Sequence, residues 1–317
     1  MYDVGIVSYG SAPLVARAMA AVLTQNPPPS RCVVVENSLD TRHWALLSEL
    51  GSRWGSLNIL VNLDPSVIEG YRTVSASTEI LLLRSRENTG FCGGNNLALR
   101  HCASPAYLSL NPDCELGDHA VSFLTAGLVE DAAVVSGVLL KYPLPELETT
   151  YGLPAEAIDA VASVVSRLTG RGRTITALPQ RELRRWRRPI TTYTGACALF
   201  DRNRLDVVGG FPEPLFLYYD EAWLSMSFRS MNWKVVLLPD VVGVHVRHSS
   251  TRAAGHKKSP LETFHAARSS LLLAKRLGLG YRITWTISCV AWAVRLLIQS
   301  PRAASGVLRG TVSGLAG

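Results

Sequence analysis

Cysteine is scarce and unpatterned in this 317-residue sequence. The six cysteines are scattered, with no CxxC pair and no ladder of short spacings. Such scattering is typical of a reducing compartment, where cysteines serve as small buried hydrophobic residues. No basic segment followed by an apolar run precedes the first strand-like residues, Tyr2 to Ser8, so we expect no secretory signal and a cytoplasmic protein.

Most of the chain has no excess of positive charge. The net charge is +7, yet eleven of the 32 basic residues and only one of the 25 acidic residues, Glu262, lie beyond residue 246. The first 246 residues are therefore slightly acidic, which argues against a uniformly basic nucleic-acid binder. A basic cluster at Arg181–Arg188 lacks interleaved aromatic residues, so we interpret it as a solvated face or a contact with an acceptor phosphate. We expect no nucleic-acid partner and an anionic surface at the C-terminal end.

No apolar run is long enough to cross a bilayer. The segment Ile283–Ile298 has about 16 residues, short of the roughly 20 that a spanning helix needs, and Arg295 interrupts it. Two apolar stripes run along it, formed by Ile283, Ile287, Val290, Val294 and Leu297 and by Trp285, Cys289, Trp292 and Leu296. Arginines at 282, 302 and 309 flank the segment, which favours a helix lying in a membrane interface. An ordinary helix packed on the protein core is the alternative.

The first half of the sequence contains an alternation of β-branched runs and helix-like segments. Strands are predicted at Val4–Ser8, Cys32–Glu36, Ile80–Leu83, Tyr107–Leu110 and Val134–Leu139. Helices are predicted between them at Leu14–Leu23 and Phe91–His101. This alternation predicts an α/β fold, a mostly parallel sheet flanked by helices, with its ligand site at the carboxyl ends of the strands.

The second half is less regular. Residues 142–190 contain several prolines and a helix-like stretch, Glu156–Leu168, and we interpret them as an insertion over the site. Strand character returns at Thr194–Phe200 and Val235–Leu238. Further helices are predicted at Asp220–Arg229 and Leu261–Leu277.

Polar residues stand directly after three of the predicted strands. They are Glu36-Asn37, Glu87-Asn88 and Asn111-Pro112-Asp113. Because the proline stiffens the last turn and aims Asp113 outward, a divalent cation held by this carboxylate, by phosphate oxygens and by water needs little else. Taken alone, an Asn-Pro-Asp sequence is most often an ordinary turn.

Two adjacent acids, Asp220 and Glu221, follow two tyrosines at the start of a predicted helix. The helix dipole stabilises carboxylates in this position. One that faces a pocket can serve as a general base, although helix-start acids without a further role are the commoner case.

A loop rich in glycine and asparagine, residues 88–96, leads into a predicted helix and suits close approach of the backbone to a ligand. It is not a Walker loop, and it lacks the GxGxxG spacing of a dinucleotide site. His245 follows a strand in the sequence HVRHSST. It can bind a metal or contact a phosphate, although a lone histidine of this kind is usually structural.

In this order, the motifs resemble those of family 2 inverting glycosyltransferases with a GT-A fold, in the branch of bacterial rhamnosyl- and galactofuranosyltransferases. The resemblance covers roughly residues 3–251. It rests on VGIVSYG, VVVEN, NTGFCGGNN, LNPD, TGACALFDR, GGFPEPLFLYYDE and HVRHSST.

The resemblance implies which residues bind the nucleotide of the donor. Glu36 stands where such enzymes usually have an aspartate that contacts the donor's base, and Asn37 lies beside it. Asn88, Gly90 and Asn95 fall in the loop that lines the nucleotide site.

It also implies a metal site and a base. Asn111 and Asp113 stand at the family's DXD-like motif, so Asp113 would bind Mg²⁺ or Mn²⁺ and the diphosphate. His245 would supply a further metal or diphosphate contact. Glu221 matches the general base, and Asp220 is its neighbour.

Three residues depart from the family's usual pattern. The paired acids are in the order Asp-Glu instead of Glu-Asp or Asp-Asp, so either the base at Glu221 is one methylene longer or Asp220 takes that role. Trp223 stands where a further acid is common, and Glu36 replaces the usual aspartate.

The function implied by the resemblance is inverting transfer of a sugar, first of all rhamnose from dTDP-rhamnose, to a lipid-linked or polysaccharide acceptor in bacterial cell-envelope synthesis. Transfer of galactofuranose or another hexose is the alternative within the class. A processive polymerase is disfavoured because the sequence lacks a QxxRW motif and several spanning helices. A non-catalytic membrane or polyanion binder built on an inactive transferase fold is the alternative from another class.

The expected organisation has two parts. Residues 1–258 would form the GT-A catalytic domain, with residues 142–190 near the acceptor site. Residues 259–317 would form a basic and apolar helical extension that holds the enzyme on the inner face of the cell membrane.

Overall fold

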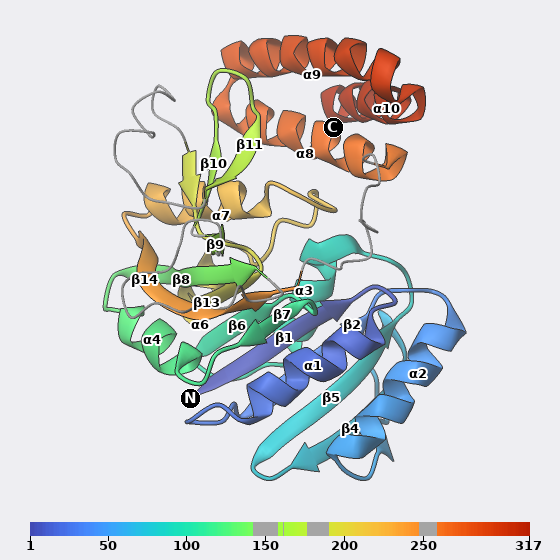
Figure 1. The fold of residues 1–317 in the computed structure, drawn as a ribbon, viewed down its shortest axis with the longest axis vertical. Coiled ribbons are helices and arrows are strands. Elements are labelled where there is room, and N and C mark those ends of the chain that lie inside the picture. Colours follow the sequence, from blue (N-terminus) through green and yellow to red (C-terminus); the bar gives the residue numbers. More distant parts are fainter. Residues whose placement is uncertain (142–157, 161, 176–189, 247–258) are drawn as a thin grey trace, which may run out of the picture.

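The structure is a computed structural model that describes residues 1–141, 158–160, 162–175, 190–246 and 259–317. A large sheet covered by helices occupies one end of the molecule, and three C-terminal helices occupy the other (Figure 1). The predicted α/β class is confirmed.

The centre of the large sheet is a block of four parallel strands. In spatial order these are β5 (Thr78–Ser85), β2 (Arg31–Glu36), β1 (Tyr2–Ser8) and β6 (Ala106–Leu110). Their sequences are β-branched or leucine-rich and almost wholly buried, as expected of strands with helices on both faces. All four of these predicted strands are confirmed.

Further strands extend this block on both sides. Beyond β6 come β13 (Cys197–Asp201), β8 (Ala132–Lys141), β14 (Lys234–His245) and β7 (Cys114–Leu116). β13 is antiparallel to both of its neighbours, and β14 runs parallel to β8. The other edge is formed by β4 (Val67–Ser75) and β3 (Asn58–Ile59).

Helices cover both faces of the sheet. One face carries α1 (Ala12–Leu23), α2 (Thr41–Gly51, continued by a 3₁₀ turn at Ser52–Trp54) and α4 (Ala120–Gly127). The other carries α3 (Gly90–Arg100), α6 (Arg202–Val207) and α7 (Asp220–Ser230). The sheet is therefore the middle one of three layers, and the carboxyl ends of its parallel strands are left open for a ligand.

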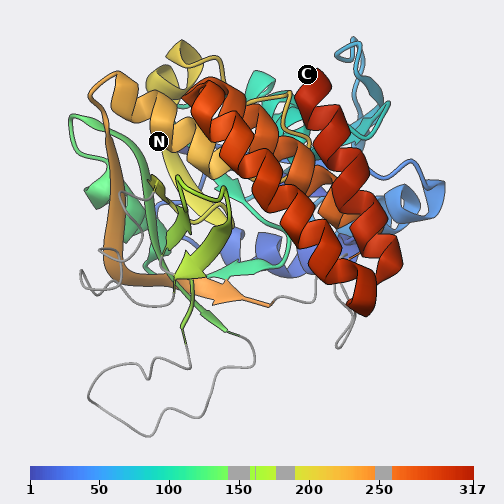
Figure 2. The same ribbon diagram turned by 90° about the horizontal axis from the view of Figure 1, so that it is seen from above.

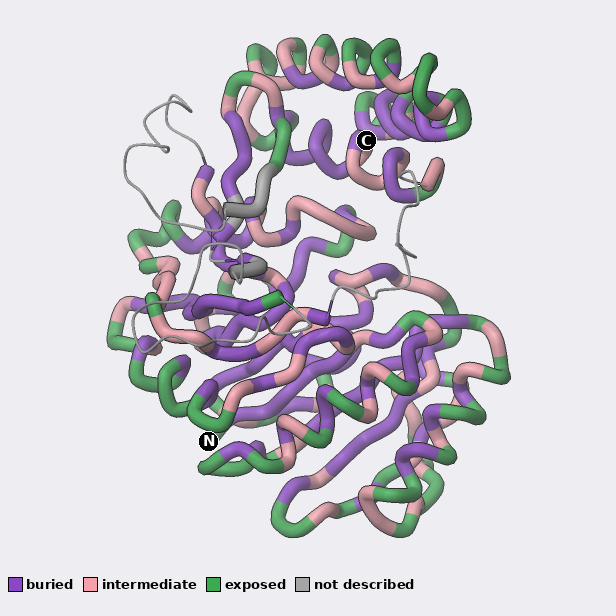
Figure 3. The backbone as a smooth tube through the Cα atoms, viewed as in Figure 1, coloured by how far each residue is buried: buried purple, intermediate pink, exposed green. Residues whose placement is uncertain are grey.

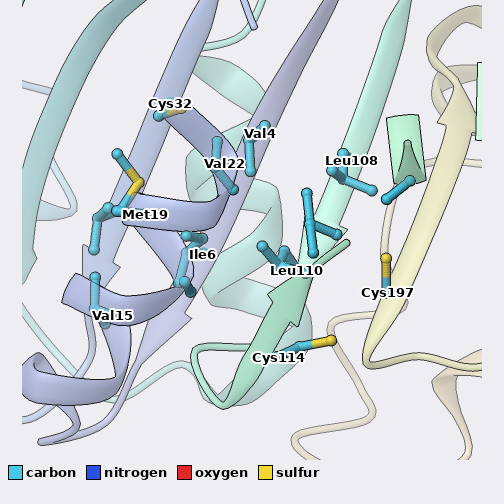
Figure 4. Packing of buried hydrophobic residues seen from close by; sticks show 14 of the residues in the cluster. Val4, Ile6, Val15, Met19, Val22, Cys32, Leu108, Leu110, Cys114 and Cys197 are labelled. Carbon is cyan, nitrogen blue, oxygen red and sulfur yellow. The ribbon is translucent and has the colours of Figure 1, made fainter. Parts of the chain in front are cut away.

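The packing of α1 on the sheet shows how the sequence pattern produces these layers. Val15, Met19 and Val22 recur at helical spacing and form one buried stripe. They lie over Val4 and Ile6, which alternate along β1 (Figure 4). Burying each such side chain contributes roughly 1.5–3 kcal/mol, so the two periodicities together fix α1 on this face.

The predicted helix at Glu156–Leu168 is wrong. Within the described residues this region forms two strands, β9 (Ile158–Ala160), which pairs with β8, and β10 (Ala162–Val165). β10 pairs antiparallel with β11 (Gly172–Ile175) and β12 (Ile190–Thr192) in a three-stranded sheet. The run Ala-Ser-Val-Val suits a strand that is paired on both sides, and this pairing overrides the local helical pattern.

The C-terminal part consists of α8 (Pro260–Leu277), α9 (Leu279–Gln299) and α10 (Pro301–Ala316). α8 and α9 were predicted, whereas α10 was not. Three glycines of α10 allow its backbone to touch that of α8: a Cβ on Gly306, Gly310 or Gly314 would lie 2.1, 2.2 or 2.8 Å from a carbonyl oxygen of α8. This spacing of four residues is the close helix-packing pattern of small residues.

Candidate active site

The end of β2 is tied to the loop after β1 by Glu36, whose side chain is fully buried. One carboxylate oxygen accepts a hydrogen bond from the Ser8 hydroxyl (2.7 Å). The other accepts from the backbone amides of Gly10 (3.0 Å) and Ser38 (2.8 Å). These hydrogen bonds hold the loop after β1 against the end of β2, and the contact of Glu36 with the donor's base stays a prediction.

Asn37 and Asn88 position the first turn of α3. The Asn37 side-chain amide donates to the carbonyl oxygen of Gly90 (2.8 Å), and the Asn88 side-chain oxygen accepts from the Gly90 amide (3.0 Å). Gly90 has a φ of 71°, and a Cβ there would lie 2.2 Å from the carbonyl oxygen of Phe216. Only glycine satisfies both the left-handed backbone and this close approach.

Asn95 points into the protein. Its side-chain oxygen accepts hydrogen bonds from the hydroxyls of Tyr107 (2.9 Å) and Ser109 (3.0 Å), and its amide donates to the carbonyl oxygen of Phe91 (3.0 Å). The side chain is buried. Asn95 therefore joins α3 to β6 and is not among the cavity-lining residues, and its place in the nucleotide site stays a prediction.

Asp113 and His245 come together from distant parts of the chain. Asp113 follows β6, and His245 ends β14. Asp113 Oδ1 lies 3.3 Å from His245 Nε2, and the backbone amide of Val246 donates to the Asp113 carbonyl oxygen (2.8 Å). The turn that holds Asp113 is closed by a hydrogen bond from the Cys114 amide to the Asn111 carbonyl oxygen (3.1 Å).

These groups share one cavity of about 590 Å³, a volume typical of small-molecule sites. Of the predicted residues, six line it: Asn37, Asn88, Gly90, Asn111, Asp113 and His245. The sequence analysis missed its other walls, which come from the loop after β1, the segment before α7 and the start of α8, and include Tyr9, Ser11, Phe216, Tyr218, Leu261 and His265. No local sequence signal indicates that α8 returns to this edge of the sheet.

The predicted acid pair, Asp220 and Glu221, begins α7 beside this cavity. The two preceding residues, Tyr218 and Tyr219, both have a φ of 68°, which is left-handed and costs a non-glycine residue roughly 1 kcal/mol or more. Backbone strain of this kind concentrates at functional sites. Tyr218 lines the cavity, so this strained turn forms part of the cavity wall.

A short segment connects the acid pair to the Asp113 turn. A Cβ on Gly195 would lie 2.6 Å from Glu221 Oε1, so the carboxylate rests against this glycine. The carbonyl oxygen of the next residue, Ala196, accepts a hydrogen bond from the Asn111 amide (2.8 Å). The acid pair is not among the cavity-lining residues and lies across this segment from Asn111.

Burial changes the protonation of the pair. Asp220 is 4% exposed, and burial together with the neighbouring Glu221 charge raises the pKa of Asp220 well above its ordinary value. Burial also raises the pKa of Glu221, whereas backbone hydrogen bonding and the hydrogen bond to Asp220 lower it. Burial and the mutual repulsion of the two carboxylates therefore disfavour the ionisation of both acids at once, and the effect on Asp220 is the stronger one.

The residues around Asp113 fit a divalent cation that is bound jointly with a phosphate ligand. Asp113 and His245 present a carboxylate oxygen and an imidazole nitrogen close enough for one ion to be shared. Among the described residues, no group of three or more His, Cys, Asp or Glu side chains could hold a metal. Further ligands would have to be diphosphate oxygens and water, which is the usual case for Mg²⁺.

Two predicted features lie outside the described residues. The basic cluster Arg181–Arg188 is one of them, and residues 247–251 of the motif that begins at His245 are the other.

Comparison with solved structures defines the class of the fold. The chain is similar to the mannosyltransferase PcManGT from Pyrobaculum calidifontis in complex with GDP-Man and Mn²⁺, with a TM-score of 0.55, 15% identity, and coverage of 99% of this chain and 86% of that one. It is also similar to S. aureus TarS 1–349 in complex with UDP-GlcNAc, with a TM-score of 0.51, 13% identity, and coverage of 98% of this chain and 90% of that one. A third similar structure is GalNAc-T7 with UDP, GalNAc and Mn²⁺, with a TM-score of 0.56, 11% identity, and coverage of 84% of this chain and 47% of that one. The fold is that of the GT-A glycosyltransferases.

Curated relatives agree with this class. The chain is 23% identical over 204 residues to the low-salt glycan biosynthesis hexosyltransferase Agl10 of Haloferax volcanii, a match that covers 63% of this chain and 62% of Agl10. It is 24% identical over 195 residues to the N-acetylglucosaminyl-diphospho-decaprenol L-rhamnosyltransferase of Mycobacterium tuberculosis, covering 60% and 62%. The chain thus spans about three fifths of the length of the relatives that it matches, and no family model matches it. The resemblance to glycosyltransferases predicted from the motifs is confirmed.

Proposed function

We propose that this protein transfers a sugar from a nucleotide-diphosphate donor to an acceptor hydroxyl, with inversion at the anomeric carbon. One observation carries the proposal: a single cavity is lined both by the loops that follow β1 and β2 and by Asp113 and His245. In a GT-A fold these two walls would hold the nucleotide and the diphosphate. The names of the relatives and of the structural neighbours support this class of reaction.

Glu221 is the proposed general base. It would take the proton of the acceptor hydroxyl as that oxygen attacks the anomeric carbon on the face opposite to the diphosphate, and a single displacement of this kind inverts the configuration. Asp220 would hold its own proton and orient the Glu221 carboxylate by a hydrogen bond. This division of roles favours Glu221 over Asp220 as the base, in spite of its extra methylene.

Asp113 and His245, with Asn111 beside them, are the residues that would hold Mg²⁺ or Mn²⁺. When bound, such an ion neutralises the charge of the departing diphosphate. The presence of Mn²⁺ in the PcManGT and GalNAc-T7 structures supports this cofactor. Asn37, Asn88 and Gly90 would orient the nucleotide so that the anomeric carbon is in line for attack.

For the donor, we propose dTDP-rhamnose as the first sugar nucleotide to test, with galactofuranosyl and other hexosyl donors as alternatives. The name of the mycobacterial relative, an L-rhamnosyltransferase of a diphospho-decaprenol glycan, supports both this sugar and a lipid-linked acceptor. A polysaccharide of the bacterial cell envelope is the alternative acceptor.

A lipid-linked acceptor requires contact with a membrane surface, and we propose α9 as the contact. Of the two predicted apolar stripes, the one with Trp285 and Cys289 is buried against the protein, and the one with Ile283 and Ile287 faces outward. Figure 3 shows the exposed residues along the outer side of α9. The outward stripe contains Ile283, Ile287, Val290, Val294 and Leu297, which are 54%, 64%, 44%, 59% and 52% exposed.

Charge supports this orientation. α9 and α10 contain four arginines, at 282, 295, 302 and 309, and no acidic residue, so their shared surface would attract anionic lipids. The two helices lie next to each other at the end of the molecule seen in Figure 2. No described helix has the length and hydropathy needed to span a bilayer. We therefore propose a cytoplasmic enzyme bound peripherally to the inner face of the cell membrane.

The function is tested by offering the protein a panel of nucleoside diphosphates and sugar nucleotides with and without Mn²⁺. A ligand that binds only the native state at 100 times its dissociation constant stabilises that state by about 2.7 kcal/mol, which is readily seen as a rise in Tm. The best ligand is then supplied as radiolabelled donor together with polyprenyl-diphosphate-linked sugars, and product formation is measured.

The expected result is a Tm increase that depends on both nucleotide and Mn²⁺, followed by transfer of the label to the acceptor. A protein that binds none of these ligands, and neither transfers nor hydrolyses any donor, would be the inactive binder on a transferase fold.

A further inference from the structure

The tight turn between β10 and β11, residues 166–171, is held between α9 and the strained turn that precedes the acid pair. On the α9 side, the indole Nε1 of Trp285 donates to the Arg167 carbonyl oxygen (2.8 Å). Trp285 is fully buried, and a Cβ on Gly170 would lie 2.4 Å from its ring. Gly170 has a φ of 68°, so only glycine places the backbone flat against this indole.

On the other side of the same turn stands Tyr219. Its hydroxyl donates to the Gly170 carbonyl oxygen (2.9 Å), and the Gly170 amide donates back to the Ser166 carbonyl oxygen (2.8 Å). The turn is thus a rigid spacer with Trp285 on one side and Tyr219 on the other. Figure 1 shows the β10–β11 hairpin reaching from the level of α7 to α9.

Tyr219 stands at the start of the helix that carries the acid pair. It immediately precedes Asp220, and its carbonyl oxygen accepts the first hydrogen bond of α7, from the Trp223 amide (2.9 Å). No side chain caps this helix start. The left-handed conformation of Tyr218 and Tyr219 is intrinsically unfavourable and persists only where surrounding contacts hold it. The hydrogen bond to Gly170 is such a contact.

We infer that the Trp285–Gly170–Tyr219 contact is a positioning device, by which the outermost C-terminal helix holds Asp220 and Glu221 in their reactive arrangement. Tyr219 and Trp285 are positioning residues, because they act on the acid pair through the turn at Gly170. The inference rests on the proposed function for the role of the acids. The contact itself is independent of that function.

The first test measures the contact without any substrate. Tyr219→Phe removes one hydrogen bond and keeps the ring, whereas Trp285→Phe removes one hydrogen bond together with the five-membered ring of the indole. Loss of such a bond shifts a local equilibrium by about fivefold, so hydrogen exchange of the Trp223 amide should become about fivefold faster in each variant. Tyr2→Phe and Trp44→Phe are matched controls: both residues are buried, and the Tyr2 hydroxyl bonds the Pro27 carbonyl oxygen at the opposite end of β1.

The second test measures the reaction. In Tyr219→Phe and Trp285→Phe we expect kcat to fall about tenfold with an unchanged KM for the donor. The KM should not change because the residues proposed to bind the nucleotide, Asn37, Asn88 and Gly90, hydrogen-bond to one another and not to the β10–β11 turn. The acidic limb of the pH profile of kcat should move to lower pH, since a loosened pair is better solvated. The double variant should lose no more activity than the worse single variant, because both side chains act through one turn.

Each outcome decides one claim. Unchanged exchange of the Trp223 amide in both variants overturns the inference, whatever the enzyme does. The inference is also overturned if the variants have a lower Tm but the same amide exchange, pH profile and kcat as the controls. Faster exchange in a protein that transfers no sugar supports the contact and places the failure in the proposed function.

Discussion

At the scale of single residues, the chemistry proposed here depends on very few atoms. Asp113 brings a carboxylate to within 3.3 Å of an imidazole, and Glu221 stands beside Asp220, whose pKa burial and the Glu221 charge raise. Asp113 is proposed to bind the metal and the diphosphate, and Glu221 is proposed to act as the base. Substitutions at the two residues should therefore have different effects.

Glu221→Gln removes the proposed base and keeps the shape of the side chain. We expect turnover to fall at least about 100-fold, the usual scale for loss of a general base, with donor binding retained. Transfer assays together with donor titration measure both quantities. Wild-type turnover in this variant would show that another group takes the proton.

Asp113→Ala should also reduce turnover at least about 100-fold, because the diphosphate loses its charge stabilisation. Unlike Glu221→Gln, it should abolish the dependence of nucleotide binding on Mn²⁺. Asp64→Ala is a suitable control, since Asp64 pairs with Arg100 (2.9 Å) at the end of α3 remote from the nucleotide loop. A Mn²⁺-dependent Tm increase that survives in Asp113→Ala would contradict the metal assignment.

Asp220→Asn tests the shared proton through stability. Burial raises the pKa of Asp220, so the folded protein prefers the protonated form, and ionisation at higher pH costs stability. The wild-type Tm should therefore fall as pH rises from the ordinary aspartate range, about 4, through the raised pKa, and Asp220→Asn should remove part of this fall because an amide does not ionise. Parallel pH dependences of Tm for the two proteins would argue against a buried proton.

At the scale of elements, the packing of α10 on α8 depends on its glycines. Gly310→Ala would place a methyl group 2.2 Å from the Phe264 carbonyl oxygen, so the helices must separate. We expect a loss of about 1–3 kcal/mol in the free energy of unfolding, as for overpacked cores, measured by denaturant titration. Gly280→Ala in α9 is the matched control, because its Cβ meets nothing within 4 Å and should stabilise the helix by up to about 1 kcal/mol.

At the scale of the whole molecule, the exposed side of α9 predicts binding to anionic bilayers. Ile287→Glu places a charge in the middle of the apolar stripe and should reduce cosedimentation with phosphatidylglycerol vesicles about tenfold or more, since both burial and charge attraction are lost. Ile59→Glu, a change at a still more exposed isoleucine of β3, should bind like the wild type. Equal binding of both variants would exclude this face as the contact.

The sequence by itself determined the central strands, three of the six described helices that cover the sheet (α1, α3 and α7) and six of the residues that line the cavity. Alternating β-branched runs and polar residues at strand ends were sufficient, because a parallel sheet brings the carboxyl ends of its strands to one edge. The same reasoning placed Asn37, Asn88, Asn111 and Asp113 at one site, and these residues do line one cavity.

Only the tertiary structure decided the rest. Local pattern assigned a helix to residues that pair as β9 and β10, because strand pairing is a non-local contact. The hydrogen bonds that tie Glu36 to the loop after β1 and Asn95 to β6 join segments that are distant in the sequence, so motif position alone did not predict them. Contacts between segments far apart in the chain decide which apolar stripe of α9 faces outward. Such contacts also place Gly170 between Trp285 and Tyr219, and no local sequence pattern encodes them.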